Sequence, residues 1–256
     1  MLNLFRRRRL PSRISYRLWQ RVANRILARF GLSPTERVRL RSLASRFLDR
    51  KTINGAGGFV VTDEIRVAIA AQACLLILYL GIEYFDGWVE VIVYPDTFVT
   101  SRDVREDTGL VHTRETALGG EAWLRGPVIL AWRDVAVGML RSGTNVVLHE
   151  FAHKIDMLNG VANGMPPLHA DMASEQWSQT LSASYENLSR AVANRVWTDI
   201  DPYAAENPAE FFAVMSETFF ERPEILYRYD AALYQQLSQF YRQDPRTRRE
   251  SFSWFG

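Results

Sequence analysis

The sequence of 256 residues predicts an α+β fold that is mainly helical, with a small mixed β-sheet directly before its central helix. Three observations lead to this prediction. Apolar residues recur at helical spacing near both ends of the chain, β-rich runs lie between those segments, and no sequence repeat is present. Hydrophobic residues make up 47% of the chain and aromatic residues 12%, a composition that favours a packed core over a disordered chain.

Charge divides the chain into a predicted basic arm, residues 1–30, and a single domain, residues 31–256. The arm has nine arginines and no acidic residue, whereas the domain has 22 basic and 29 acidic residues. From Ile14 onward the arm has apolar residues near helical spacing, and such a basic amphipathic helix suits an anionic membrane or a nucleic acid. We favour the alternative, in which its apolar side packs on the domain. We expect no direct nucleic-acid binding, because no recognised nucleic-acid-binding motif accompanies the arm.

The single cysteine predicts a reducing, cytoplasmic location. Cys74 cannot form a disulfide within the chain, and its place in the apolar run Ile65–Leu80 favours a buried, inert thiol. That run is too short to cross a bilayer. The N-terminus has arginines but no apolar stretch behind them, so we expect no secretory signal.

Two helices are predicted before the β-rich segments. The segment Ser33–Glu36 matches a capping box with proline at the first helical position, and its helix extends to about Arg50. Glycines between positions 55 and 58 predict a loop. Thr62 then caps an apolar helix that ends near Gly81.

Three runs are candidate strands. Residues 88–94 are rich in β-branched and aromatic side chains and stop at Pro95, which is typical of a strand. Residues 109–112 form a second candidate. Residues 128–132 form a third, and they directly precede the central helix.

The central helix is predicted over residues 144–158, where apolar positions provide a surface for burial. Helical spacing predicts three further helices, over residues 174–196, 208–220 and 231–241. The segment 199–207 is predicted to be irregular. The order of helices, then strands, then helices is the basis of the α+β prediction.

The central helix contains the pattern H-E-x-x-H at His149, Glu150 and His153. Positions four apart lie on one face of a helix, so both imidazoles can reach one metal ion. Zinc suits this pair, because imidazole nitrogen is a preferred ligand and a catalytic zinc needs three protein ligands plus water. Glu150 is then placed to take a proton from that water. Composition alone gives about 0.004 expected matches to the pattern, so we prefer this interpretation to a helix with two ordinary histidines.

Two histidines leave zinc one protein ligand short. A metzincin carries a glycine and a third histidine where this chain has Asp156 and Asn159, which excludes that class. Asp156 lies on the same helical face as His149, and we favour it as a hydrogen-bond partner of an imidazole rather than as a ligand. His112 and His169 are weaker candidates for the third ligand, and we favour ordinary structural roles for both.

A glutamate from the helix at 208–220 is the other candidate for the third ligand. Glu210 and Glu217 lie seven residues apart on one face of this largely apolar helix, where a buried carboxylate needs a partner. Glu210 also occupies the third helical position, where a capping-box glutamate belongs. The residues alone therefore leave ligand and cap equally open.

Two segments together resemble the Mlc titration factor A family of zinc peptidases. They are H-E-F-A-H-K-I-D, which begins at His149, and D-P-Y-A-A-E-N-P-A-E-F-F-A-V-M-S-E-T-F-F, which begins at Asp201. V-I-V-Y-P at 91–95 and G-P-V-I-L-A-W at 126–132 are similar as well. The resemblance implies a single zincin-like metallopeptidase domain with a gluzincin-type site, similar to the catalytic domain of anthrax lethal factor.

The resemblance also implies the residues of the site and their roles. It places one Zn²⁺ per chain on His149, His153 and Glu210, with Glu150 as general base. Tyr203 would face the site and donate a hydrogen bond to the oxyanion of the reaction. The implied activity is hydrolysis of peptides, with an aminopeptidase-like preference.

The resemblance further implies a protein partner, the transcriptional repressor Mlc, through which the family affects expression of the glucose phosphotransferase. The alternative function is therefore a zinc-bearing binding protein that sequesters a repressor without catalysis. Hydrolysis requires Glu150, whereas binding does not. We favour the enzyme, because Glu150 lies inside the motif and has no obvious structural task.

Overall fold

The computed structural model describes residues 14–96, 126–139 and 143–248 of the chain. Its α-helices are α1 (Tyr16–Ile26), α2 (Pro34–Arg50), α3 (Asp63–Leu76), α5 (Trp132–Gly138), α6 (Val146–Asp156), α7 (Ser174–Ala193), α8 (Pro208–Glu221), α9 (Pro223–Tyr229) and α10 (Ala231–Tyr241). Its strands are β1 (Thr52–Gly55), β2 (Glu90–Tyr94) and β3 (Val128–Ala131). Its 3-10 helices are η1 (Ala28–Phe30), η2 (Ile82–Phe85), η3 (Met157–Asn159) and η4 (Pro202–Ala205).

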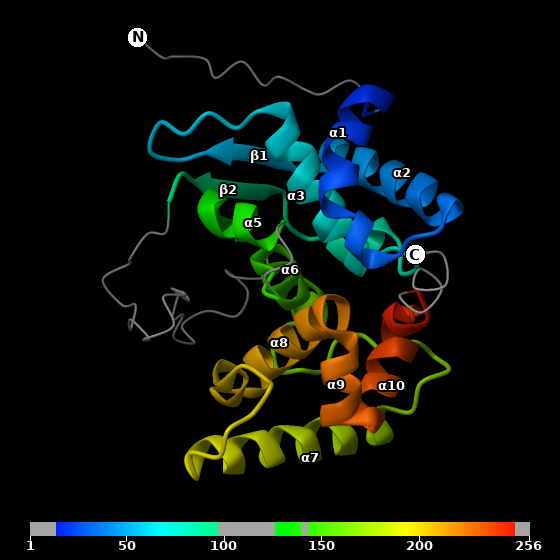
Figure 1. Ribbon diagram of the computed structural model, residues 1–256, viewed down its shortest axis with the longest axis vertical. Coiled ribbons are helices and arrows are strands. Elements are labelled where there is room, and N and C mark those ends of the chain that lie inside the picture. The colour runs from blue at the N-terminus through cyan, green and yellow to red at the C-terminus, as the bar shows by residue number, and fades with distance from the viewer. Residues whose placement is uncertain (1–13, 97–125, 140–142, 249–256) are drawn as a thin grey trace.

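Helix α6 lies at the centre of the molecule (Figure 1). The helices α1 to α3 and the sheet lie on one side of it, and α7 to α10 lie on the other. It contacts α3 and β3 on the first side and α8 on the second. Its residues Val147, Leu148, Phe151 and Ile155 have no exposed surface, so the two sides share one core around it. The chain therefore places the H-E-x-x-H helix where both sides can hold it.

The described strands form a parallel sheet in the order β1-β2-β3. The prediction of an α+β fold, mainly helical, is confirmed. The sequence predicts a mixed sheet, but the described strands are all parallel. A helical connection through α3 joins β1 to β2, and parallel neighbours need such a crossover. The strand predicted at 109–112 lies outside the described residues.

Three described strands or α-helices differ from the sequence prediction. The strand Thr52–Gly55 lies where the glycines predict a loop; Ile53 is its one buried residue, so it has little apolar pattern. It forms because its backbone pairs with β2. Trp132 begins helix α5 rather than ending a strand, and Pro223–Tyr229 form the unpredicted helix α9.

The N-terminal segment packs into the core from Ile14 onward. Helix α1 begins after Ser15, whose hydroxyl accepts a hydrogen bond from the backbone N–H of Leu18 at 3.3 Å. The apolar side of the helix, including Trp19 and Ile26, is buried. The structure thus agrees with the interpretation in which the apolar side of the basic segment packs on the domain. The division of the chain at residue 30 stays a prediction.

Several end signals read from the sequence are confirmed. The Ser33 hydroxyl accepts from the Glu36 N–H at 3.3 Å, and the Glu36 carboxylate accepts from the Ser33 N–H at 2.9 Å, which completes the capping box. Helices α7, α8 and α10 begin where the sequence places them.

Cys74 is a buried free thiol on α3, and burial raises its pKa. Within the described ranges, no helix combines the length and hydropathy needed to cross a bilayer.

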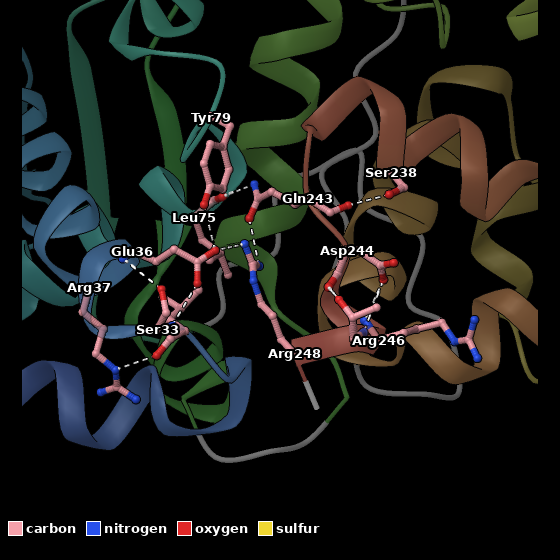
Figure 2. Close-up of polar contacts among 12 residues, drawn as sticks. Ser33, Glu36, Arg37, Leu75, Tyr79, Ser238, Gln243, Asp244, Arg246 and Arg248 are labelled. Atoms are coloured by element: carbon pink, nitrogen blue, oxygen red, sulfur yellow. Dashed lines mark hydrogen bonds and ion pairs between the residues drawn. The ribbon is translucent and has the colours of Figure 1, made fainter. Parts of the chain in front are cut away.

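The segment after α10 is fixed to the N-terminal helices by a group of polar contacts that we call the terminal clasp (Figure 2). The Arg248 guanidinium donates to the Glu36 carboxylate at 2.5 Å and to the Gln243 side chain at 3.0 Å. The Gln243 amide in turn donates to the carbonyl of Leu75 at 2.9 Å. Gly31 has a φ of +60°, and a Cβ there would lie 2.7 Å from the Arg248 carbonyl oxygen. The clasp therefore needs a glycine at this position.

Candidate metal centre

The H-E-x-x-H helix presents both histidines to one point. Asn145 caps α6, since its side-chain oxygen accepts from the Leu148 N–H at 3.2 Å. His149 is buried and His153 is partly buried, and their ring centroids lie 4.9 Å apart, edge to face. Their Nε2 atoms are separated by 3.3 Å. The spacing of four residues thus brings two ligand nitrogens together, as the sequence predicts.

Helix α8 brings a carboxylate to the same point. Asn207 caps α8, because its side-chain oxygen accepts from the N–H groups of Ala209 and Glu210, both at 3.0 Å. The carboxylate of Glu210 lies against the two imidazoles, with Oε2 3.1 Å from His149 Nε2 and 3.3 Å from His153 Nε2. Of the two possibilities left open by the sequence, the structure therefore places Glu210 with the histidines.

The three potential metal-ligand atoms, Nε2 of His149, Nε2 of His153 and Oε2 of Glu210, form a nearly equilateral triangle with edges of 3.1, 3.3 and 3.3 Å. A tetrahedral zinc ion with bonds of about 2.0–2.1 Å needs neighbouring ligand atoms about 3.3 Å apart. The triangle therefore has the dimensions of one face of such a tetrahedron. Two imidazole nitrogens and one carboxylate oxygen also match the donor set of catalytic zinc sites, in which the fourth position stays open.

The buried charges around the triangle influence one another strongly. Burial disfavours the imidazolium of His149, but the adjacent carboxylates of Glu210 and Glu217, which attract its protons, outweigh this and raise its pKa well above the usual value. Burial acts against the Glu210 carboxylate, but the two imidazoles lower its pKa. The Glu210 carboxyl is therefore held in its ionised form, which is the form that binds a cation.

Glu150 lies on α6 next to His149 and keeps part of its surface exposed. Burial raises the pKa of Glu150, and the nearby His149 and His153 oppose this shift. A carboxylate with a raised pKa that is still accessible to solvent is a suitable proton acceptor. The position of Glu150 is compatible with the role predicted from the sequence.

Tyr203 comes from the segment predicted to be irregular, where the structure has η4. Asp201 fixes the start of η4 by accepting from the Tyr203 N–H at 2.9 Å, and the Tyr185 hydroxyl donates to the Ala205 carbonyl at 3.2 Å. The Tyr203 ring centroid lies 6.2 Å from that of His149. Burial and the charge of Glu210, to which the hydroxyl donates, raise the pKa of Tyr203. The phenol is therefore a hydrogen-bond donor held beside the triangle.

Comparison with known proteins identifies the family of the chain. The family described as glucose-regulated metallo-peptidase M90 matches residues 2–242. The chain belongs to this family. Mlc titration factor A of Salmonella agona is 42% identical over 223 residues, 85% of this chain and 83% of that protein. An uncharacterized protein of Synechocystis is 39% identical over 231 residues, 89% of this chain and 84% of that protein.

Membership of the M90 family confirms the resemblance found in the sequence and the zincin-like fold. A metallo-peptidase family implies a bound metal ion. The residues present fit one, because His149, His153 and Glu210 bring three ligand atoms within 4.8 Å of one another. They come from two helices that are each capped by an asparagine side chain.

The other candidates for the metal site lie elsewhere in this M90 chain. The Asp156 carboxylate accepts from the Gly164 N–H at 2.8 Å through Oδ2, and its Oδ1 accepts from no imidazole among the described residues, so the prediction that it accepts from an imidazole is wrong. The loop after α6 folds back, and its backbone N–H groups contact the Asp156 carboxylate instead. His169 Nε2 lies 2.8 Å from the Phe240 carbonyl oxygen, which agrees with a structural role. His112 lies outside the described residues.

Glu217 is the carboxylate that approaches the second nitrogen of a histidine. Its Oε2 lies 3.5 Å from Nδ1 of His149, whereas Glu210 lies at Nε2 of the same ring. The sequence places Glu210 and Glu217 on one helical face, but it does not show that both reach one imidazole. That contact depends on how α6 and α8 pack.

The buried carboxyl of Asp156 gives a prediction about stability. Burial raises its pKa from 3.8 to about 6, although N–H groups of the following loop oppose the shift. Between about pH 4 and pH 6 the unfolded chain ionises before the folded protein does, so stability decreases as pH rises. Asp156→Asn removes this dependence. From pH 4 to pH 7, the free energy of unfolding of the variant should rise relative to wild type by at most about 3 kcal/mol.

The measurement is urea unfolding of both proteins at several pH values, with a chelator present so that bound metal does not contribute. A difference between the two proteins that stays constant from pH 4 to pH 7 would show that Asp156 titrates normally.

Proposed function

We propose that the protein is a zinc-dependent peptidase of the reducing cytoplasm with an aminopeptidase-like preference. Zn²⁺ would be held by Nε2 of His149, Nε2 of His153 and a carboxylate oxygen of Glu210. The observation that carries the proposal is the triangle of these three atoms, whose edges of 3.1–3.3 Å suit one face of a tetrahedral zinc site. The aminopeptidase-like preference rests on the family resemblance. The proposed cytoplasmic location rests on the buried free thiol of Cys74.

The metal, when bound, supplies a Lewis acid that polarises the scissile carbonyl and makes water more acidic. Glu150 accepts the proton of the attacking water and delivers it to the leaving amine. Its partly exposed position on α6 supports this role, because water and substrate must reach the carboxylate.

Tyr203 stabilises the oxyanion that develops on the substrate. Its raised pKa keeps the hydroxyl protonated, so it donates a hydrogen bond across the working pH range. Its place beside Glu210 and His149 supports this role. The neighbouring contacts of Asp201 and Tyr185 with η4 hold the backbone that carries the phenol.

Removal and return of zinc tests the proposal. Hydrolysis of a series of amino-acid and short-peptide anilides is measured with wild-type protein in three states. These are the zinc-loaded protein, the protein after dialysis against a chelator, and the dialysed protein after zinc is returned. We expect activity to disappear with the metal and to return at about one zinc ion per chain. Zinc-loaded protein that hydrolyses none of these substrates would count against a peptidase and favour the second candidate.

The second candidate is a zinc-bearing regulatory protein that binds the repressor Mlc without cleaving it, and so affects expression of the glucose phosphotransferase. The observation in its favour is the name of the Salmonella relatives, Mlc titration factor A, at 42% identity over 85% of this chain. Calorimetric titration of purified Mlc with wild type and with Glu150→Gln tests it. Equal binding by both proteins, with no activity on any anilide, would favour this function.

A further inference from the structure

We infer that Glu217 is a positioning residue of the metal site, which holds His149 so that its Nε2 faces the ion. The inference rests on the zinc site proposed above. Glu210 and Glu217 lie seven residues apart on α8, about two helical turns, and so share one face. Glu210 approaches Nε2 of His149 and Glu217 approaches Nδ1, so a single helix contacts the ring from both nitrogens. The ring can present only one of them to a metal.

The carboxylate of Glu217 has two separate partners. Its Oε2 lies 3.5 Å from Nδ1 of His149, and its Oε1 accepts a hydrogen bond from the backbone N–H of Asn145, the cap of α6. The side chains of Glu217 and His149 are only 13% and 4% exposed, so water screens this contact little. A carboxylate at Nδ1 favours the tautomer with its proton there, which leaves the lone pair on Nε2 for the metal.

A buried network fixes the second partner of Glu217. The Asn145 side-chain amide donates to the Gln72 oxygen at 3.0 Å and to the Glu221 carboxylate at 2.8 Å. Glu221 also pairs with Arg29 at 2.5 Å, and both side chains are at most 5% exposed. Asn145 is therefore held from α3 and α8 together. Glu217 is therefore hydrogen-bonded to a fixed N-cap residue, four positions before His149, so its carboxylate has a defined position.

Glu217→Gln separates positioning from packing, because the two side chains have nearly the same size. The amide oxygen can still accept from the Asn145 N–H, but the NH₂ group then points toward Nδ1 of His149. An NH₂ group is a donor only, so Nδ1 must accept and the ring proton moves to Nε2, where the metal should bind. We expect the zinc dissociation constant to rise by about 10- to 100-fold. The thermal midpoint of the metal-free protein should change little.

Glu36→Gln is the matched control. The side chain of Glu36 is 12% exposed, close to the 13% of Glu217, and it pairs with Arg248 in the terminal clasp rather than with residues of the metal site. Its variant should lower the thermal midpoint and leave the zinc dissociation constant within about threefold of wild type. Zinc affinities are measured by competition with a chromophoric chelator on metal-free protein whose folding is checked by circular dichroism.

Two results would overturn the inference while leaving the zinc site intact. One is wild-type zinc affinity in Glu217→Gln, and the other is an equal loss of affinity in Glu36→Gln. If Glu217→Gln does not fold, Glu217→Asp replaces it; the shorter side chain withdraws from His149, and wild-type affinity in that variant would equally overturn the inference. Wild-type protein that binds no zinc would instead refute the proposed function itself.

Discussion

Glu150→Gln is expected to reduce peptide hydrolysis by about 10²–10⁴-fold while zinc stays bound. Glutamine has nearly the same shape as glutamate, but it cannot accept a proton from water or return one to the leaving amine. Glu150 is also adjacent to the ligand His149 without belonging to the triangle of donor atoms. The variant should therefore lose turnover and retain the metal.

The measurement pairs anilide hydrolysis with the zinc content of wild type and variant. Glu186→Gln serves as control, since Glu186 lies on the exposed face of α7, where it pairs with Arg190. Hydrolysis at the wild-type rate by zinc-loaded Glu150→Gln would remove the general base from the mechanism. Loss of zinc in this variant would show that Glu150 supports the metal rather than the proton transfer.

Tyr203→Phe should lower turnover by about 10²–10³-fold, the usual cost of removing one donor from an oxyanion site. The phenol is absent from the triangle of ligand atoms and contacts it through Glu210. Its loss should therefore affect the transition state more than binding of metal or substrate. We expect a fall in kcat with little change in KM and with the zinc content of wild type.

Tyr229→Phe is the matched control for this second variant. The Tyr229 hydroxyl is part-buried and donates to the Ser184 carbonyl at 3.0 Å, away from the triangle. Its removal should affect stability by about 1 kcal/mol and leave turnover unchanged. Equal turnover in Tyr203→Phe and Tyr229→Phe would assign Tyr203 a packing role, and loss of zinc from Tyr203→Phe would refute its proposed role.

The elements that carry their own end signals could be predicted from the sequence. Ser33 and Glu36 fix the start of α2, and Pro208 follows the asparagine that caps α8. β1 could not be predicted, because its four residues bury one side chain and depend on pairing with a distant strand. The short helix α9 could not be predicted for a different reason, since Pro223 ends the helical run of α8 and the helix that it begins has only seven residues.

The residues of the metal site likewise divide into those that could be predicted from local sequence and those that depend on the packing of helices. His149 and His153 are four residues apart on one helix, so their shared face follows from helix geometry alone. Glu210 comes from another helix, and the residues alone could not separate a ligand from a cap; the resemblance favoured the ligand. The approach of Glu217 to Nδ1 of His149 depends on the packing of α6 on α8, which no local pattern encodes.

The terminal clasp also has a consequence for biosynthesis. Glu36 and Arg248 are separated by 212 residues, so Glu36 is synthesised long before Arg248. Folding during translation proceeds from the N-terminus. Helices α2 and α3 are therefore made long before the arginine that neutralises Glu36 and the Gln243 amide that donates to the end of α3. Helices α2 and α3 therefore reach their final set of contacts only after residue 248 has been synthesised.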